Sequence, residues 1–501
     1  MPLLLLLAVF VIATCGLIYE LVAGTLASYL LGDSIMQFST IIGVYLFAMG
    51  IGSFLSKYFN KNLLTWFVKI EFLVALIGGF SAAILFVLFP LASSFRIVLY
   101  FLVFLTGTLV GLEIPILMRI LKDKVEFKEL VSQVFTFDYI GALLASIIFP
   151  LVLVPYLGLI RTSLFFGILN AAVGFLLCFK FEQEIRRPMF LKITAVAIIL
   201  SQLVAFVLSD RIMNFSETLT YNDHVIYSTS SPYQRIVVTR NKKELRLFLN
   251  GNLQFASSDE YRYHEALVHP VMAALHQPEN ILVLGGGDGL AVRELLKYNS
   301  VKKITLVDLD AAMTKLFTTN PMLTAINKGA LQDGRVTVFN ADAFQWMRDN
   351  QQQFDAIIID FPDPSSFSVG KLYSNTFYKL VYKALAQHGI AVIQSTSPYV
   401  APKSYWCINK TLASVGFKTI PYHNYVPSFG EWGYTMAMKD SIYNSPTQFV
   451  KGLRFLNDAT MQQMLVFPQD MTTTASLVVN KLNNQELVQY FEAEWNAYLQ
   501  Q

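Results

Sequence analysis

The first 210 residues contain several apolar stretches that are each long enough to cross a lipid bilayer, and this feature limits the fold more than any other. A transmembrane helix needs about 20 predominantly apolar residues. By this criterion residues 1–210 predict a bundle of about seven spans, at 3–30, 36–56, 64–90, 97–120, 134–157, 159–179 and 190–209. The first stretch lacks a basic leader and others follow it at once, so we expect a retained helix rather than a secretory signal.

Basic side chains fall in every second loop between these stretches: Lys57 and Lys61; Arg119, Lys122, Lys124 and Lys128; Lys180, Arg186, Arg187 and Lys192. Short loops rich in Lys and Arg are usually cytoplasmic. With seven spans, this pattern places the rest of the chain on the outer side of the membrane.

Several ionisable residues lie within the apolar stretches, among them Glu20, Lys69, Glu71, Glu113 and Asp138. Such groups are costly in hydrocarbon and normally face the interior of a bundle, where they form a polar pathway or pair between helices. Lys69 and Glu71, near a helix end, fit pairing or an interfacial position. Glu113 and Asp138 are the better candidates for a site.

The charge balance and the cysteines exclude several classes of protein. The 38 basic and 35 acidic residues give a net charge of only +3, which does not suit a nucleic-acid partner. Cys15, Cys178 and Cys407 are far apart, so they predict neither a disulfide framework nor a metal site.

The pattern changes after residue 210 to short alternating runs, such as 234–239 and 245–249, which predict strands. We expect a small β-strand region over 211–279, an α/β Rossmann-like domain of the methyltransferase type over 280–440, and a helical C-terminal extension over 441–501. The expected fold is therefore a multi-pass α-helical membrane domain followed by this α/β part.

The Rossmann-like pattern begins with a buried strand at residue 280, a glycine-rich turn that includes Gly285 and Gly287, and an amphipathic helix. A second strand ends in Asp308, where a carboxylate can accept hydrogen bonds from both hydroxyls of a ribose. A third strand precedes Asp342 and Ala343, which are suitably placed for an adenine amino group. The alternative is a glycine turn that serves only close packing.

Three acids are expected at one crevice. Asp288 lies inside the glycine turn, where it would repel a pyrophosphate, and a fourth strand ends in Asp360 with Asp363 close behind. Asp363 alone could instead stabilise a turn beside its prolines. Together the acids favour a cationic ligand.

These motifs resemble those of the polyamine aminopropyltransferases, the spermidine synthases, in the branch that is fused to a multi-span region. The resemblance covers roughly residues 230–440. Its motifs are YQRI at 233–236, LNGNLQ at 249–254, DEYRYHEALVHP at 259–270, GGGDG at 285–289, VDLD at 307–310 and DFPDP at 360–364.

The resemblance implies that an amine of putrescine or a related polyamine attacks decarboxylated S-adenosylmethionine, giving spermidine and methylthioadenosine, with no cofactor and no metal. It implies that Asp360 is the base, that Asp363 and His264 contact the polyamine, and that Asp288 holds the aminopropyl amine. It further implies nucleoside contacts from Gln234, Gln254, Asp308, Asp342 and Ala343, and a substrate-closing loop at 425–434 with Tyr425 and Trp432 as walls and Glu431 as an extra acid. Departures at Asn250, Phe361, Pro362 and Phe367 leave the acceptor amine open.

Two other functions remain open at this point. One is an S-adenosylmethionine-dependent methyltransferase, although Asp288 would repel the carboxylate of that donor. The other is a membrane protein that transports or senses polyamines. The expected partners are the lipid bilayer, the polyamine and the decarboxylated donor, and a homo-oligomer stays open.

The expected location is the inner membrane. Loop charge puts the catalytic domain outside, whereas both substrates are made in the cytoplasm and a charged sulfonium does not cross hydrocarbon unaided. Substrate supply favours the cytoplasmic face.

Overall fold

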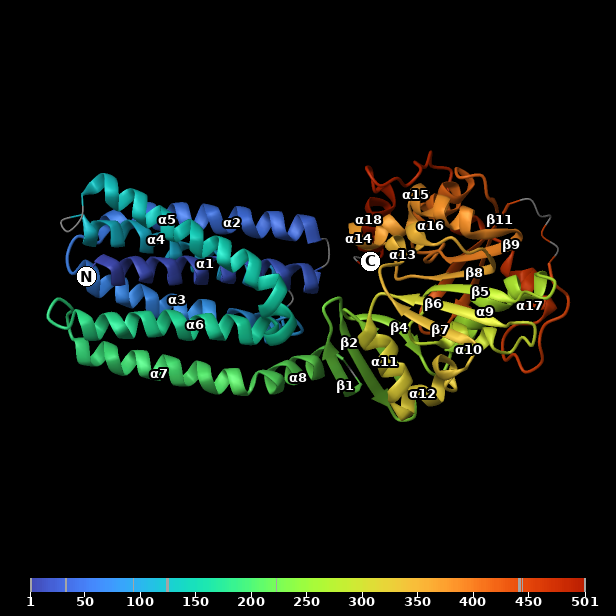
Figure 1. Ribbon diagram of the computed structural model, residues 1–501, viewed down its shortest axis with the longest axis horizontal. Coiled ribbons are helices and arrows are strands. Elements are labelled where there is room, and N and C mark those ends of the chain that lie inside the picture. The colour runs from blue at the N-terminus through green and yellow to red at the C-terminus, as the bar shows by residue number, and fades with distance from the viewer. Residues whose placement is uncertain are drawn as a thin grey trace. The chain divides into compact units, whose positions relative to one another are not determined.

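The computed structural model describes residues 2–31, 34–92, 94–122, 126–221, 223–439, 443 and 445–499, so Lys124 lies outside the described residues. The chain divides into two compact units, Met1–Val225 and Ile226–Gln501. We describe each unit by itself (Figure 1).

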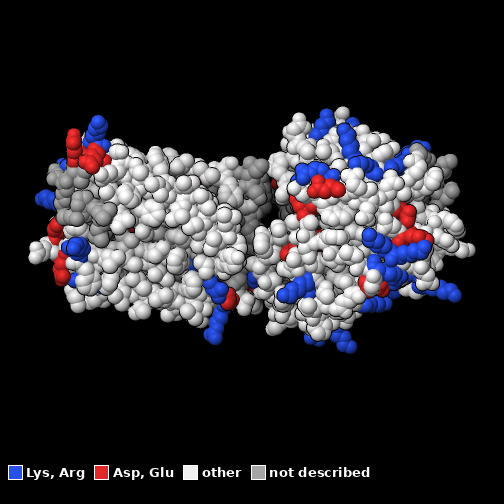
Figure 2. Space-filling view, viewed as in Figure 1, with Lys and Arg blue, Asp and Glu red and all other residues white. Residues whose placement is uncertain are grey.

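Long helices build the first unit: α1 (Pro2–Leu31), α2 (Ser34–Leu55), α3 (Leu63–Leu88), α4 (Phe95–Leu121), α5 (Phe127–Ile148), α6 (Val154–Lys180) and α7 (Pro188–Val207). A 3₁₀ turn, η1 (Ser56–Tyr58), follows α2, and a π-helical segment, η2 (Phe149–Leu153), joins α5 to α6. Many apolar side chains on the outside of this unit are exposed, among them Ile97, Phe101 and Leu143. In Figure 2 charged side chains lie mainly near the ends of these helices and are almost absent from the middle of the visible face.

Among the described residues, six helices are long and apolar enough to cross a membrane, whereas seven spans are predicted from the sequence. The difference arises because the expected spans at 134–157 and 159–179 belong to one helical segment, Phe127–Lys180, of 54 residues. A straight helix of that length would measure about 80 Å, far more than the hydrocarbon thickness of about 30 Å. Gly158, with φ 70° and ψ 176°, breaks this segment, and Figure 1 shows that the chain reverses direction between α5 and α6.

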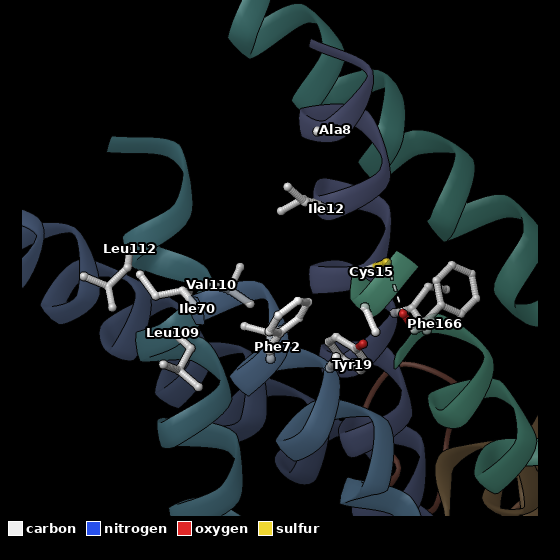
Figure 3. Close-up of a cluster of buried hydrophobic side chains, with 14 of the residues drawn as sticks. Ala8, Ile12, Cys15, Tyr19, Ile70, Phe72, Leu109, Val110, Leu112 and Phe166 are labelled. Carbon is white, nitrogen blue, oxygen red and sulfur yellow. Dashed lines mark hydrogen bonds between the residues drawn. The ribbon is translucent and has the colours of Figure 1, made fainter. Parts of the chain in front are cut away.

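The helices of this unit share an apolar core, part of which is shown in Figure 3. Cys15 of α1 is fully buried there, and its thiol donates to the carbonyl of Phe166 in α6 at 3.6 Å. Helices α2 and α4 approach closely because Gly52 and Gly111 lie between them: a Cβ at Gly111 would stand 2.2 Å from the carbonyl oxygen of Met49.

The predicted boundary near residue 210 is wrong in one respect, because residues 211–220 are helical rather than β. They belong to α8 (Ser209–Thr220), an amphipathic helix. The hydroxyl of Ser216 donates to the carbonyl of Phe86 in α3 at 2.6 Å, which ties α8 to the helical unit.

A four-stranded sheet follows: β1 (His224–Ser230), β2 (Arg235–Asn241), β3 (Glu244–Leu249) and β4 (Asn252–Ala256). The β2–β3 and β3–β4 pairs are antiparallel. Asn250 and Gly251 make the turn between β3 and β4, with φ values of 50° and 82°. This left-handed backbone is what an Asn-Gly hairpin turn requires. Helix α9 (Glu260–Ala274) comes next.

The larger sheet has seven strands in the order β10-β11-β9-β8-β5-β6-β7. Their bounds are β5 (Asn280–Gly285), β6 (Lys303–Asp308), β7 (Val336–Asn340), β8 (Phe354–Asp360), β9 (Leu385–Gln394), β10 (Lys418–Val426) and β11 (Gly430–Met438). The pairs from β7 to β9 are parallel, and the pairs that β11 makes with β9 and β10 are antiparallel.

Helices cover both faces of this sheet (Figure 1). They include α9, which contacts β8 to β11, and α10 (Leu290–Leu295), α11 (Ala311–Thr319), α12 (Pro321–Asn327), α13 (Ala343–Asp349), α14 (Phe367–Gly370), α15 (Asn375–Ala384) and α16 (Pro402–Ala413), with the 3₁₀ turns η3 (Ala330–Gln332) and η4 (Lys371–Tyr373). Ile281 and Val283 of β5 pack into one apolar layer, and Leu282 and Leu284 pack into the other. A parallel strand that is buried on both faces needs this continuous apolar run.

The C-terminal region is less helical than the expected extension over 441–501. The described residues of this region form α17 (Asp458–Met464), α18 (Glu486–Leu499) and the 3₁₀ turn η5 (Gln469–Met471). Pro446 and Pro468 interrupt the segment, since proline removes a backbone donor. Glu265 of α9 accepts hydrogen bonds from the backbone N–H groups of Arg454, Phe455 and Leu456, and this holds the irregular part in place.

Candidate active site

The glycine-rich turn brings the ends of three strands together. Gly285 and Gly286 have φ values of 79° and 66°, which favour glycine. A Cβ at Gly285 would stand 2.2 Å from the carbonyl oxygen of Asp360, and a Cβ at Gly287 would stand 2.7 Å from the carboxylate of Asp308. The turn therefore lies directly against the carboxyl ends of β8 and β6, where ligands of open α/β sheets bind.

Asp308 ends β6 and is bonded to the turn. Its carboxylate accepts the N–H of Gly287 at 3.0 Å and the N–H of Asp310 at 2.8 Å. Burial raises the pKa of Asp308 to about 6. Gln234, from the loop between β1 and β2, donates to the carboxylate of Asp310 at 2.9 Å, so it reaches the same end of β6.

Asp360 ends β8, in register with Gly285 of β5. Burial raises the pKa of its carboxyl group, although the charge of His264 and a hydrogen bond from Tyr263 work against this. The hydroxyl of Tyr263, on α9, donates to Oδ1 of Asp360 at 2.5 Å. Tyr263 is not among the site residues predicted from the sequence, although its place in DEYRYHEALVHP, directly before His264, was a signal for it.

Asp288 and His264 are also buried near Asp360. Oδ1 of Asp288 accepts the N–H of Leu290 at 2.8 Å, and burial raises the pKa of this acid to about 6. Burial alone would lower the pKa of His264, but the hydrogen bond and charge of Glu260, with the charges of Asp288 and Asp360, raise it to about 9. The imidazole is therefore cationic at neutral pH and sits among carboxylates.

His264 is held by a buried ion pair that the sequence analysis missed. Its Nδ1 lies 3.0 Å from Oε2 of Glu260, one helical turn earlier on α9. The guanidinium of Arg293, on α10, donates to both carboxylate oxygens of Glu260 at 2.9 Å. A bidentate pair of this kind fixes the orientation of the carboxylate and, through it, that of the imidazole.

Asp363 lies beyond the end of β8. Its Oδ1 accepts a hydrogen bond from Nε2 of Gln394 at 3.1 Å, and burial raises the pKa of the acid to about 7. The same amide nitrogen donates to the carbonyl of Phe361 at 2.9 Å. Gln394, the last residue of β9, therefore positions the Asp360–Asp363 segment, a role that no local pattern in the sequence indicated.

Asp342 caps α13 after β7. Its Oδ1 accepts the N–H groups of Phe344 and Gln345, and its Oδ2 lies 2.7 Å from Nζ of Lys371. Burial would raise the pKa of Asp342, but the Lys371 ammonium lowers it overall. Ala343 follows as the first, buried residue of the helix.

The segment expected as a closing loop at 425–434 consists of the ends of β10 and β11 and the turn between them. The turn is anchored, because Ser428 donates two hydrogen bonds to Asp259. Tyr425 is 52% exposed. The carboxylate of Glu431, the expected extra acid, lies 2.9 Å from Nδ1 of His423.

The rings of Trp432, Phe429 and Tyr263 lie in a row that ends at Asp360, the hydrogen-bond partner of Tyr263. The ring of Trp432 lies 5.3 Å from that of Phe429, which in turn lies 6.1 Å from the ring of Tyr263. The indole N–H of Trp432 is buried and has no hydrogen-bond partner among the described residues. Gln254 donates to the carbonyl of Asn252 in its own hairpin at 3.3 Å, a contact that does not reach the acids.

Within the described part of the chain, no three His, Cys, Asp or Glu side chains lie close enough together to hold a metal ion. The arrangement of β5, the glycine turn and Asp308 is that of nucleoside-binding domains. The buried acids Asp288, Asp360 and Asp363 add negative charge beside it. Fold and site thus define a Rossmann-like domain that can bind a nucleoside together with a cationic group.

Comparison with known proteins identifies the family. Residues 260–447 match the profile of the spermine/spermidine synthase domain. A polyamine aminopropyltransferase of Leptospira interrogans is 50% identical over 98% of both chains, and polyamine aminopropyltransferase 2 of Ralstonia nicotianae is 53% identical over 99% of both. A crystal structure of spermidine synthase in complex with the transition state analogue AdoDATO is 28% identical, with a TM-score of 0.46 over 49% of this chain and 86% of that chain.

The chain therefore belongs to the polyamine aminopropyltransferase family, as its motifs indicated. The alignments extend over nearly the whole chain. The similarity thus includes the N-terminal helices as well as the Rossmann-like domain.

Proposed function

We propose that the protein transfers the aminopropyl group of decarboxylated S-adenosylmethionine to putrescine or a related polyamine. With putrescine the products are spermidine and methylthioadenosine. The observation that carries this proposal, beside the family, is the set of buried acids at the carboxyl edge of the sheet: Asp288, Asp360 and Asp363. A sulfonium donor and an ammonium acceptor are both cations, and carboxylates attract both.

In the proposed step, the acceptor nitrogen attacks the propyl carbon that is bonded to the sulfonium. A C–N bond forms as the C–S bond breaks, and the electron pair of the broken bond remains on sulfur, which becomes a neutral thioether. The attacking amine must lose a proton, and Asp360 is the proposed acceptor. Burial raises the pKa of Asp360 toward the working pH, which suits a general base.

The nucleoside is proposed to lie across the glycine turn. Gly285 and Gly287 allow its close approach, and Asp308 accepts hydrogen bonds from the ribose hydroxyls. Each oxygen of Asp308 already accepts one backbone N–H and keeps further lone-pair capacity. Asp342 and Ala343 are the proposed adenine contacts, with Gln234 and Gln254 as further nucleoside contacts.

The amines are proposed to bind the remaining acids. Asp288 would hold the aminopropyl amine, and Asp363 with His264 would contact the polyamine. Tyr425 and Trp432 would form the walls of this site.

Product analysis by mass spectrometry tests the reaction. The full-length protein is incubated with decarboxylated S-adenosylmethionine or with S-adenosylmethionine, each in the presence of putrescine, cadaverine or spermidine. We expect aminopropylated amine and methylthioadenosine from the decarboxylated donor alone, since Asp288 repels the carboxylate of the other. Methylated amine would overturn the proposal in favour of a methyltransferase.

We also propose that the helical unit lies in the inner membrane, with the catalytic domain facing the cytoplasm. The exposed apolar side chains of six long helices support insertion. Loop charge opposes this orientation, whereas the supply of charged substrates supports it. The decisive measurement is labelling with an impermeant maleimide in intact cells.

For this labelling, Cys407 is a poor reporter, because Cys15, Cys178 and Cys407 are all buried. A cysteine placed at the exposed residue Gln352 avoids the difficulty, with the wild-type chain as the background control. We expect labelling of Gln352→Cys only after lysis. Labelling in intact cells would place the domain outside.

A further inference from the structure

The helical unit contains a cavity of about 190 Å³ that the reaction above does not use. Residues from α1, α2, α3, α4 and α5 line it. Its polar lining includes three acids, Glu20, Glu113 and Asp138, and its walls are largely apolar side chains such as Ile12, Leu117 and Val110. An engineered cavity of about 150 Å³ is large enough to bind benzene, so this one can hold a small organic molecule.

Glu113 is the central observation. It lies on α4, is 1% exposed and lines the cavity. Neither of its carboxylate oxygens has a hydrogen-bond partner among the described residues. Buried polar groups are almost always hydrogen-bonded, and an unpaired one needs an explanation such as a bound ligand.

The charge of the lining indicates the class of ligand. Among the residues that the structure describes, the lining includes no Lys, Arg or His to neutralise the three acids. Tyr45 does not serve them either, because its hydroxyl donates to the carbonyl of Gly16 at 2.8 Å. A cation inside the cavity would supply the missing partner.

The spacing of the acids and the apolar walls favour an organic cation over a metal ion. Hard metal ions need several oxygen ligands around one point, and no three described His, Cys, Asp or Glu side chains are close enough together for that. A chain of methylene groups that ends in ammonium groups could instead contact the walls and reach separate carboxylates.

We propose that this cavity is a second binding site, selective for aliphatic amines, within the helical unit. Glu113 is the main counter-ion of the bound ammonium, and Glu20 and Asp138, which are both partly exposed, are the others. The cavity and Glu113 carry this proposal by themselves. The choice of putrescine and spermidine as probes rests on the proposed function.

Equilibrium binding of radiolabelled putrescine and spermidine to the full-length protein in lipid nanodiscs, with saturating methylthioadenosine, tests the proposal. We expect two amine sites per chain in the wild type. Glu113→Gln should remove one of them, and Asp363→Asn should remove the other. Glu129→Gln is the matched control, because Glu129 is an exposed acid of the same unit outside the cavity, and it should keep both sites.

A steric variant makes the test independent of charge. Ala142 lines the cavity, so Ala142→Phe should fill it and remove the same site as Glu113→Gln. Aminopropyl transfer by both variants reports that the protein has folded. The proposal would be overturned if the wild type bound only one amine and Asp363→Asn removed that site. It would also be overturned if Glu113→Gln and Ala142→Phe both kept two amine sites. Loss in Ala142→Phe alone would overturn the assignment of Glu113.

The cavity site and the proposed reaction fail independently. If the wild type forms no aminopropylated product yet keeps a site that depends on Glu113, the reaction is wrong and the cavity site stands. In that case a folded state is verified by a monodisperse elution profile in place of activity.

Discussion

The hydroxyl of Tyr263 donates a 2.5 Å hydrogen bond to Oδ1 of Asp360 and joins α9 to the end of β8. The two residues are 97 positions apart in the chain. The hydrogen bond favours the charged carboxylate and so limits the rise in the pKa of Asp360 that burial causes. Tyr263 is thereby a positioning residue that also adjusts the proposed base.

Tyr263→Phe should raise the pKa of Asp360. A hydrogen bond to a charged group contributes about 1.5 to 3 kcal/mol, which corresponds to a rise of about one to two pKa units. Since the base acts when deprotonated, the acidic limb of the kcat profile should move to higher pH by that amount. Tyr261→Phe, on the same helix, is the control and should leave the profile in place. A rate that falls equally at all pH values would instead indicate a purely structural role.

Asp360→Asn should abolish turnover and leave nucleoside binding nearly intact. The change removes the proposed proton acceptor without touching the ribose and adenine contacts, and general base catalysis typically contributes about 10²- to 10⁴-fold. Calorimetric titration with methylthioadenosine measures the affinity, and steady-state product formation measures the rate. Loss of binding together with activity would mean that Asp360 is structural.

Asp308→Asn should weaken nucleoside binding through the ribose. In the wild type, removal of one ribose hydroxyl from methylthioadenosine should cost about 1.5 to 3 kcal/mol, as expected for a hydrogen bond to a charged acceptor. In the variant, removal of the same hydroxyl should cost much less binding free energy, because the amide oxygen of the introduced asparagine is already a weaker acceptor than the carboxylate of Asp308. This double comparison separates a ribose contact from a general loosening of the turn that Asp308 also holds. Equal penalties in both proteins would exclude the ribose assignment.

Binding of a diamine to the catalytic site should release protons between about pH 6 and 7. Burial raises the pKa of Asp363 to about 7 and that of Asp288 to about 6, so both are partly protonated there. A bound dication favours the ionised forms and lowers both pKa values, while an alkyl ammonium with a pKa near about 10.4 keeps its proton. The apparent affinity should therefore increase as pH rises through this window.

Calorimetry in buffers of different ionisation enthalpy counts these protons. The titrations use the Glu113→Gln variant, which should lack the cavity site, so that only amine binding to the catalytic site is measured. Adding Asp363→Asn should remove the larger part of the release near pH 7. A proton count of zero throughout the range from pH 6 to pH 7 would contradict the assignment of Asp363 to the amine.

Much of the catalytic fold could be predicted because its signals are local. The apolar runs of β5 and β8, the glycine turn and the acids at the strand ends follow one another at short spacing, and parallel strands always bring their carboxyl ends to one edge. Predictions failed where local preference was weak. Residues 211–220 became helical through packing on α3, and the region after residue 441 is held largely by contacts such as those of Glu265.

Within the apolar stretches, too, local sequence did not predict which charged side chain is buried. Lys69 and Glu71 look alike in the sequence, two charges near a helix end. Positions two apart point about 200° away from each other around a helix. In the structure Lys69 is exposed, with its ammonium 4.6 Å from the ring centre of Trp66, whereas Glu71 is fully buried.

By itself, the sequence determined the class of each part of this protein: apolar helices long enough for a membrane, and a Rossmann-like domain with acids at its strand ends. Only the tertiary structure decided which groups meet. Tyr263 with Asp360, Gln394 with Asp363 and the unpaired Glu113 in its cavity all depend on contacts between distant segments. Periodicity and spacing record the local conformation of a chain, and such contacts arise only when its elements pack together.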